Sequence, residues 1–154
     1  MSTSHLNLDA RARPHLFHWN GRMNRPTLLE WLQTNHLADH CPDDLLAFWE
    51  ETGGGDVFES ETILGPLGDP EMGDGFIEVN RAMHAQGMPA RLFIFHRGLM
   101  TSAFDTEIGD YLELDPVDFR VIRRFQSLDS WYCATLRHEF GARYGLPDVG
   151  STLS

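Results

Sequence analysis

Two cysteines and eight histidines are the side chains of this sequence best suited to covalent or metal chemistry. Cys41 stands between His40 and Pro42, and Pro42 is expected to begin a helix. A thiol at a helix N-terminus can have a lowered pKa, and a histidine close to it can act as its base. A small hydrolase that uses Cys41 and His40 is therefore one hypothesis, although catalytic partners are brought together by folding more often than by adjacency in sequence.

The remaining histidines and the serines form no catalytic or metal-binding motif. His36 and His40 have the spacing of an HExxH pair but lack its glutamate, and the adjacent His138 and Glu139 would point to different sides of a helix. No GxSxG turn is present, and a phosphate-binding P-loop is excluded because the chain contains no lysine. The sequence thus predicts no catalytic residue, no metal site and no bound cofactor.

Negative charge is concentrated in one part of the chain. The formal net charge is −11, and between Arg25 and Arg81 thirteen acidic residues occur without a single basic one. Such a field repels the phosphates of nucleic acids and attracts cationic partners, so direct binding of nucleic acid is disfavoured. The alternative, that the acids only keep the protein in solution, remains open at this point.

The cysteines and the apolar pattern predict a cytoplasmic protein that does not associate with membranes. Cys41 and Cys133 have no CxxC spacing and are too few for the disulfide framework of a small secreted domain. The first residues contain no apolar run of the length of a signal peptide. Nowhere does the chain have about eighteen consecutive apolar residues, the length that a membrane-spanning helix requires.

Two helices should position the acidic block. The first is expected over residues 27–36 and the second from Pro42, with acidic residues in its first turn, where the helix dipole favours them. Phe48 and Trp49 belong to the buried stripe of the second helix. The three glycines at 53–55 should end it, since glycine adopts left-handed backbone conformations without strain.

The rest of the chain alternates strand and helix patterns. Within residues 91–95, four consecutive apolar residues follow Arg91, as in a strand buried on both faces. The alternation of residues 117–125 breaks at Ile122, as at a β-bulge. The expected fold class is a single α+β domain with an antiparallel or mixed sheet of about four to six strands flanked by helices. The expected segments are an extended strand over 56–64, a loop over 65–75, a short helix over 76–87, strands over 91–95, 99–104, 110–114 and 117–125, and a helix from Ser127 to near Gly145.

Three segments of this sequence resemble the SUKH superfamily. LADHCPDDLLAFWEETGGGDVFESETILGP is similar to its N-terminal signature of a proline-started helix, an aromatic residue, a glycine turn and an acidic strand. MPARLFIFHRGLMTSAFDTEIGDYLELDP resembles its paired strands, and FQSLDSWYCATL its closing helix. The family's Asn-Gly turn is replaced by Thr52 and Gly53, and its glycine-rich loop between the central strands by Arg97 and Gly98, which leaves the subgroup open.

The resemblance covers about residues 37–140, and the whole chain is expected to have three parts. Residues 1–25 are expected to be an irregular extension, residues 26–146 the SUKH-like α+β domain, and residues 147–154 a C-terminal tail. The family consists mainly of cytosolic immunity proteins that neutralise toxins of neighbouring bacteria, many of them nucleases, and it includes fungal cell-wall regulators. None has an established active site.

The resemblance and the charge together imply a non-enzymatic bacterial immunity protein that binds a cognate basic protein toxin through an acidic surface. A regulatory protein-binding scaffold without an inhibitory role is the alternative, followed by the cysteine-dependent hydrolase. In the expected binding surface, Phe58 provides an apolar anchor, and the acidic residues around it supply the negative electrostatic field. The expected partner-binding residues are Asp43, Asp44, Glu50, Glu51, Asp56, Phe58, Glu59 and Glu61.

Overall fold

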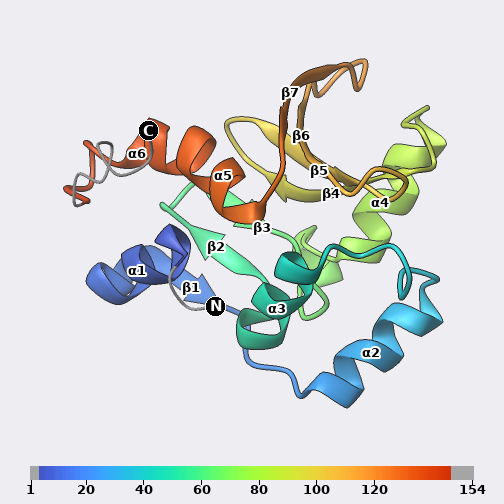
Figure 1. The fold of residues 1–154 in the computed structure, drawn as a ribbon, viewed down its shortest axis with the longest axis horizontal. Coiled ribbons are helices and arrows are strands. Elements are labelled where there is room, and N and C mark those ends of the chain that lie inside the picture. Colours follow the sequence, from blue (N-terminus) through green and yellow to red (C-terminus); the bar gives the residue numbers. More distant parts are fainter. Residues whose placement is uncertain (1–3, 147–154) are drawn as a thin grey trace.

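Seven antiparallel strands, which follow one another in the sheet in the same order as in the chain, form the framework of the protein. The computed structural model describes residues 4–146 (Figure 1). The strands are β1 (Phe17–Trp19), β2 (Gly55–Val57), β3 (Glu61–Ile63), β4 (Leu92–Arg97), β5 (Thr101–Asp105), β6 (Tyr111–Leu114) and β7 (Val121–Phe125). The predicted single α+β domain is confirmed, with more strands than expected.

Along the chain, helices occur before the first strand, between strands and after the last strand. They are α1 (His5–Ala12), α2 (Arg25–Thr34), α3 (Asp43–Thr52), α4 (Phe76–Ala85), α5 (Leu128–Tyr132) and α6 (His138–Phe140). Between them lie the 3₁₀ turns η1 (Pro14–Leu16) and η2 (Pro70–Met72) and the π-helical segment η3 (Cys133–Arg137). Within residues 4–146 no helix has both the length and the apolar character needed to cross a membrane.

Helices α3, α4 and α5 pack against one face of β5. Ser102 and Phe104 share that face, because side chains alternate along a strand. The indole of Trp131 on α5 donates a hydrogen bond to Ser102 Oγ over 2.8 Å. Trp49 on α3 and Phe76 on α4 lie 6.5 and 6.4 Å from the Phe104 ring, measured between centroids. The core is therefore centred on aromatic residues contributed by three helices.

The expectation that residues 1–25 are an irregular extension is wrong for the described part, which forms α1, η1 and β1. Ser4 accepts a hydrogen bond from the Asn7 N–H and so caps α1. Strand β1 pairs with β2, with Phe17 opposite Val57. A strand of three residues is too short to show a hydrophobic alternation, so β1 has no recognisable pattern in the sequence. The expected tail at 147–154 lies outside the described residues.

Helix α3 begins and ends where the sequence predicts. Pro42 is its N-cap, and Gly53 ends it with a φ of 68° in the left-handed region. Glycine is required at this position for a second reason, because a Cβ there would lie 2.7 Å from the Gly21 carbonyl oxygen. The glycines therefore let the chain pass directly from α3 into β2.

Two β-bulges interrupt the strand pairing, one in the central strand β4 and one in the edge strand β7. In β4 the pairing shifts between Ile94 and His96, so that Phe95 and His96 both reach the α5 side, with their rings 4.7 and 5.2 Å from Trp131. In β7 the pairing skips Ile122, which is 48% exposed. The predicted break at Ile122 is confirmed, as is the burial of β4 on both faces.

The segment 56–64 differs from its expected form. Instead of one extended strand it contains most of the hairpin of β2 and β3, turned at Phe58 and Glu59. These two residues have positive φ angles of 51° and 67°, which are uncommon for residues with a side chain. The Phe58 ring stabilises this turn by packing 5.2 Å from Phe17 and 5.1 Å from Phe140, between ring centroids. The result is an additional strand and a turn in which Phe58 is buried while Glu59 is exposed.

Candidate functional site

Two of the eight predicted binding residues are inside the protein. Phe58 has 0% of its surface exposed and Glu61 has 1%. The prediction of Phe58 as an exposed anchor is wrong because its turn directs the ring into the aromatic core. The prediction of Glu61 as a surface charge is wrong because Glu61 stands opposite the buried Val57 in the hairpin and shares its inward face.

Glu61 belongs to a buried chain of polar groups that links β3, β4, β5 and α5. His96 Nε2 lies 2.9 Å from Glu61 Oε1, and His96 Nδ1 lies 3.0 Å from Ser102 Oγ. Burial alone would raise the pKa of Glu61, but hydrogen bonds from His96 and the Leu99 N–H outweigh it and lower that pKa. Burial lowers the pKa of His96, which keeps the imidazole neutral, with Nε2–H donating to the carboxylate.

This order of acid, histidine and serine is that of a hydrolase triad, but the environment is that of a core. His96 and Ser102 each have 0% exposure, and Ser102 Oγ already accepts a hydrogen bond from the indole of Trp131. A nucleophile must reach its substrate, and in this structure no substrate can approach the buried Ser102. The network therefore stabilises the core. Nothing in the spacing of Glu61, His96 and Ser102 along the chain could have revealed it.

The Cys41–His40 pair is not arranged as an activated thiol. Burial, and then the charges of Asp44 and Asp43, raise the pKa of Cys41 to about 12. The thiol donates to the Pro42 carbonyl oxygen over 3.6 Å, and within residues 4–146 no hydrogen bond joins it to His40. A nucleophilic cysteine needs the opposite shift, toward a lower pKa. Burial, together with the acids that begin α3, suppresses the reactivity that the helix N-terminus would otherwise favour.

A groove of about 390 Å³ lies where α1, α3 and α5 meet, and it is the site that most resembles a binding surface. Its floor is apolar and consists of Leu6, Ala47, Phe48 and Leu128. Its rim carries the carboxylates of Asp43, Asp44, Glu51 and Asp129, together with Ser4 and Asn7. None of the described residues that line it is basic. We call it the α1–α3–α5 groove.

Two of the rim carboxylates hold the helices in place. Asp44 accepts hydrogen bonds from the Tyr111 hydroxyl and, over 2.7 Å, from the Leu128 N–H that begins α5. Burial and the charge of Asp44 raise the pKa of Tyr111, so the phenol remains the donor. Asp129 accepts from the backbone N–H of His5 over 2.7 Å, which ties α5 to the first turn of α1.

The other two rim carboxylates face solvent. Asp43 and Glu51 are exposed, and within the described part of the chain neither takes part in an ion pair or a side-chain hydrogen bond. They lie on α3 about two turns apart, on the side that faces the groove. These two residues are therefore available to a partner without loss of an internal contact.

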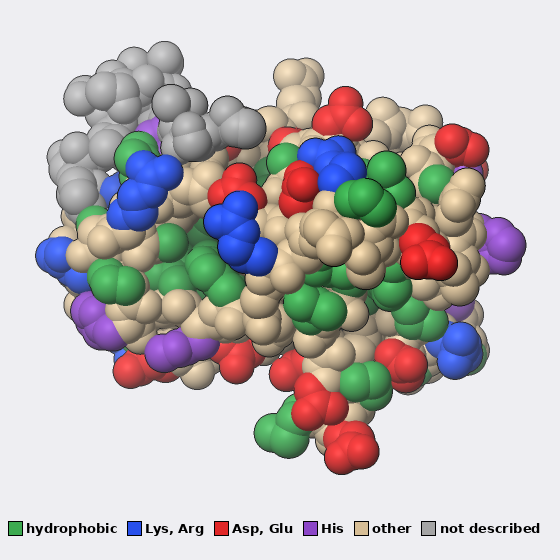
Figure 2. Space-filling view, turned by 90° about the horizontal axis from the view of Figure 1, so that it is seen from below, with side chains coloured by type: hydrophobic (Ala, Val, Ile, Leu, Met, Phe, Trp, Pro, Cys, Tyr) green, Lys and Arg blue, Asp and Glu red, His purple; other side chains and the backbone are tan. Residues whose placement is uncertain are grey.

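The remaining predicted acids lie outside the lining of the groove. Glu50 is paired with Arg25 over 2.6 Å, Asp56 accepts from Thr62 over 3.0 Å, and Glu59 accepts from the Tyr144 hydroxyl. On the face seen in Figure 2, acidic side chains are spread out and interrupted by arginines. On this side of the molecule the acids therefore cluster only locally, and the expected contiguous acidic face stays a prediction.

Sequence reasoning found three of the four rim carboxylates and missed Asp129. Asp129 stands in the first turn of α5, 78 positions beyond Glu51 in the numbering, and only folding brings it to the groove. On the far side of Glu51, Arg11 and Arg22 line a smaller hollow of about 260 Å³. These arginines mark the limit of the acidic rim.

No protein-family model and no curated protein sequence matches this chain. Membership of the SUKH superfamily therefore stays a prediction that rests on the three quoted segments.

Proposed function

We propose that this protein is a non-enzymatic binding protein that holds a basic partner protein in the α1–α3–α5 groove, and that the partner is a toxin which it neutralises in the bacterial cytoplasm. The observation that carries the proposal is an apolar groove with four carboxylates on its rim and no basic residue in its described lining. The two cysteines, both free, fit a reducing compartment. The proposal includes no cofactor, metal or nucleic acid as a requirement for binding.

The groove offers the two kinds of contact that protein interfaces combine. Phe48 and Leu128 form an apolar floor on which a partner side chain can be desolvated, and such central contacts provide most of the affinity of an interface. A long cationic side chain suits the groove, because its aliphatic part can lie on the floor while its charge reaches Asp43 or Glu51. The net charge of −11 adds long-range attraction for a basic protein.

Inhibition follows if the partner's own active surface is the cationic one. A nuclease must present positive charge to bind phosphates, and a protein that covers this surface with carboxylates competes with the substrate. Nucleases are therefore the class of toxin that the groove suits best. The same reasoning applies to any toxin that acts on a polyanion.

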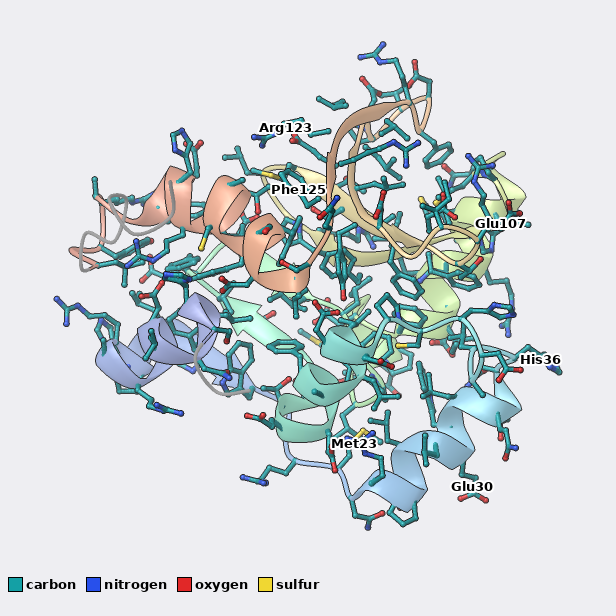
Figure 3. The ribbon with its side chains drawn as sticks, in the orientation of Figure 1. Met23, Glu30, His36, Glu107, Arg123 and Phe125 are labelled. Carbon is teal, nitrogen blue, oxygen red and sulfur yellow. The ribbon has the colours of Figure 1, made fainter. Side chains whose placement is uncertain are left out.

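The test compares three forms of the tagged full-length protein in capture from the native lysate. Asp43→Asn with Glu51→Gln removes the two solvent-facing rim charges. Glu30→Gln with Glu107→Gln is the matched control, with the same change in net charge at exposed positions on α2 and on the β5–β6 turn, far from the groove (Figure 3). We expect a basic partner to be retained by the wild type and the control and lost by the groove variant. Equal retention by all three forms contradicts the proposal.

A second measurement separates an inhibitor from a scaffold. The captured partner is purified and its own activity is measured with and without an excess of this protein, plasmid DNA and RNA being the first substrates. Loss of activity in the presence of the wild type, and much weaker loss with the groove variant, is expected. A partner that binds through the groove but keeps full activity would support the regulatory scaffold instead.

A further inference from the structure

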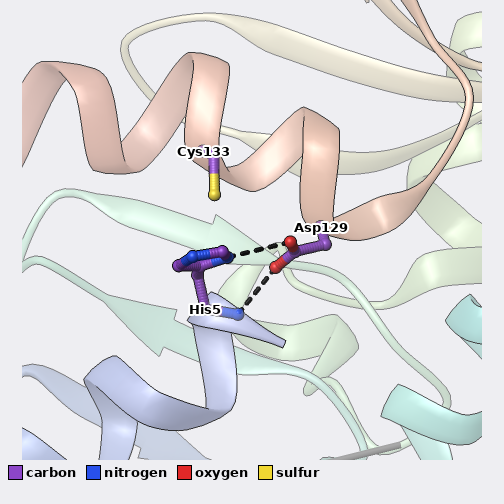
Figure 4. Close-up of side chains that lie close together, drawn as sticks. All are labelled: His5, Asp129 and Cys133. Carbon is purple, nitrogen blue, oxygen red and sulfur yellow. Dashed lines mark hydrogen bonds and ion pairs between the residues drawn. The ribbon is translucent and has the colours of Figure 1, made fainter. Parts of the chain in front are cut away.

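Three side chains with metal-binding atoms converge beside the α1–α3–α5 groove. They are His5 in the first turn of α1, Asp129 in α5 and Cys133 at the start of η3 (Figure 4). One ligand atom from each, a ring nitrogen, a carboxylate oxygen and the thiol sulfur, all lie within 4.8 Å of one another. In the described part of the chain this is the only group of three or more such residues placed so closely.

We propose that His5, Asp129 and Cys133 form a binding site for a divalent transition metal ion, with Zn²⁺ as the preferred ion and water as the fourth ligand. Imidazole, thiolate and carboxylate are the three ligand types that proteins use for zinc. Magnesium and calcium prefer sites made of oxygen atoms alone, so a site with one nitrogen and one sulfur selects against them.

The separation of the ligand atoms suits a metal ion between them. His5 Nδ1 and Asp129 Oδ2 are 2.9 Å apart. Two ligands at about 2.05 Å from a tetrahedral zinc ion lie about 3.3 Å apart, so the pair has to open by only about 0.4 Å. Asp129 and Cys133 stand four positions apart, and the Cys133 N–H bonds to the Asp129 carbonyl oxygen, which places their side chains on one side of the helix.

The helix has an irregular geometry at this point. The π-helical segment η3 begins at Cys133, directly after the regular turn that contains Asp129. Single π-helical turns are rare in proteins. Those that do occur are often found at functional sites, where the wider turn redirects side chains. This is an observation about the backbone and is independent of the ligand types.

The charges balance when the metal is bound. The Asp129 carboxylate and the Cys133 thiolate together offset the two positive charges of the ion. The Cys133 S–H bond breaks, a sulfur–metal bond forms, and the proton leaves to solvent. Arg137 is the basic residue next to the cluster, and Asp9 engages it over 2.7 Å, so its charge is largely compensated.

The site is preorganised and open to solvent. The His5 backbone N–H donates to Asp129 Oδ1, and Asp9 on α1 accepts from Tyr132 on α5 over 2.7 Å, so α1 and α5 are already joined without metal. The side chains of His5 and Asp129 are 16% and 36% exposed. Asp129 also belongs to the rim of the groove, which gives an ion a path to the cluster.

The test is titration of the reduced, metal-free, full-length protein with Co²⁺, followed by displacement with Zn²⁺. A thiolate-to-cobalt charge-transfer band in the near ultraviolet and the visible bands of a four-coordinate site should saturate at one ion per chain, and Zn²⁺ should abolish both. Cys133→Ser should lose the charge-transfer band, whereas Cys41→Ser, the matched control, should keep it. His5→Gln should keep the band but weaken Co²⁺ binding at least tenfold.

A second measurement uses the unmodified protein, in case a variant fails to fold. Zn²⁺ should slow alkylation of Cys133 at least tenfold, with the modified cysteine identified by peptide mass, and should leave the rate at Cys41 unchanged. The absence of a saturable cobalt spectrum, or a band that follows Cys41, overturns the proposal. So does equal alkylation of Cys133 with and without Zn²⁺.

Discussion

Replacement of His96 by glutamine should change how the stability of the protein depends on pH. Burial lowers the pKa of His96 in the folded protein, although Glu61 opposes this shift. In the unfolded chain the imidazole binds a proton below its ordinary pKa of 6.5. Protons therefore bind the unfolded state first as the pH falls, and stability is lost below about 6.5. This direction is the same for every group whose pKa is lower in the folded state.

The size of the effect follows from proton linkage. If only the unfolded state binds the proton at His96, the free energy of unfolding falls by about 1.4 kcal/mol between about pH 7.5 and 5.5. Over the same interval, the free energy of unfolding of His96→Gln should fall by about 1.4 kcal/mol less than that of the wild type. At neutral pH, His96→Gln should cost about 1–3 kcal/mol, since the amide cannot reproduce both hydrogen bonds, to Glu61 and to Ser102.

The assay is urea unfolding at a series of pH values, with the slope of free energy against denaturant checked for constancy. His15→Gln, at an exposed position, controls for the loss of a histidine as such. If wild type and His96→Gln lose the same free energy between the two pH values, the buried neutral imidazole is refuted. The folded protein also has a lowered pKa at Glu61. Protonation of this residue should therefore destabilise the protein further below pH 4.5, the ordinary pKa of the group.

Three more results are expected from the same structure. Phe58→Ala should lower the free energy of unfolding by about 3–5 kcal/mol in urea, because it empties a fully buried aromatic site. Asp44→Asn should cost about 1–3 kcal/mol in the same assay and loosen the start of α5, because its carboxylate holds Tyr111 and the Leu128 N–H. Iodoacetamide should modify Cys41 more than tenfold slower than free cysteine at about pH 8, because its pKa is raised to about 12; fast labelling would revive the hydrolase hypothesis.

The acid-rimmed groove and the His5–Asp129–Cys133 cluster share one residue. Asp129 lines the groove and hydrogen-bonds to His5. The groove variant used to test partner binding leaves this residue unchanged, and the cobalt titration requires no partner. The two proposals can therefore fail or succeed separately.

The sequence by itself determined the elements whose signals are local. Pro42 begins α3 through its fixed φ, and the glycines at 53–55 end it through left-handed backbone. Both effects act within a few residues. The bulge at Ile122 was visible for the same reason, as a break in a two-residue period. The fold class followed from the order of such segments.

Only the tertiary structure decided which side chains are buried and which meet. Glu61 and Asp56 stand in adjacent strands of one hairpin and look alike in sequence, yet strand pairing buries Glu61 and leaves Asp56 exposed, because a shift of one residue reverses the face. His5 and Asp129 lie 124 positions apart and meet only because α1 docks on α5. Contacts of that kind depend on how whole elements pack, and no spacing in a single sequence encodes them.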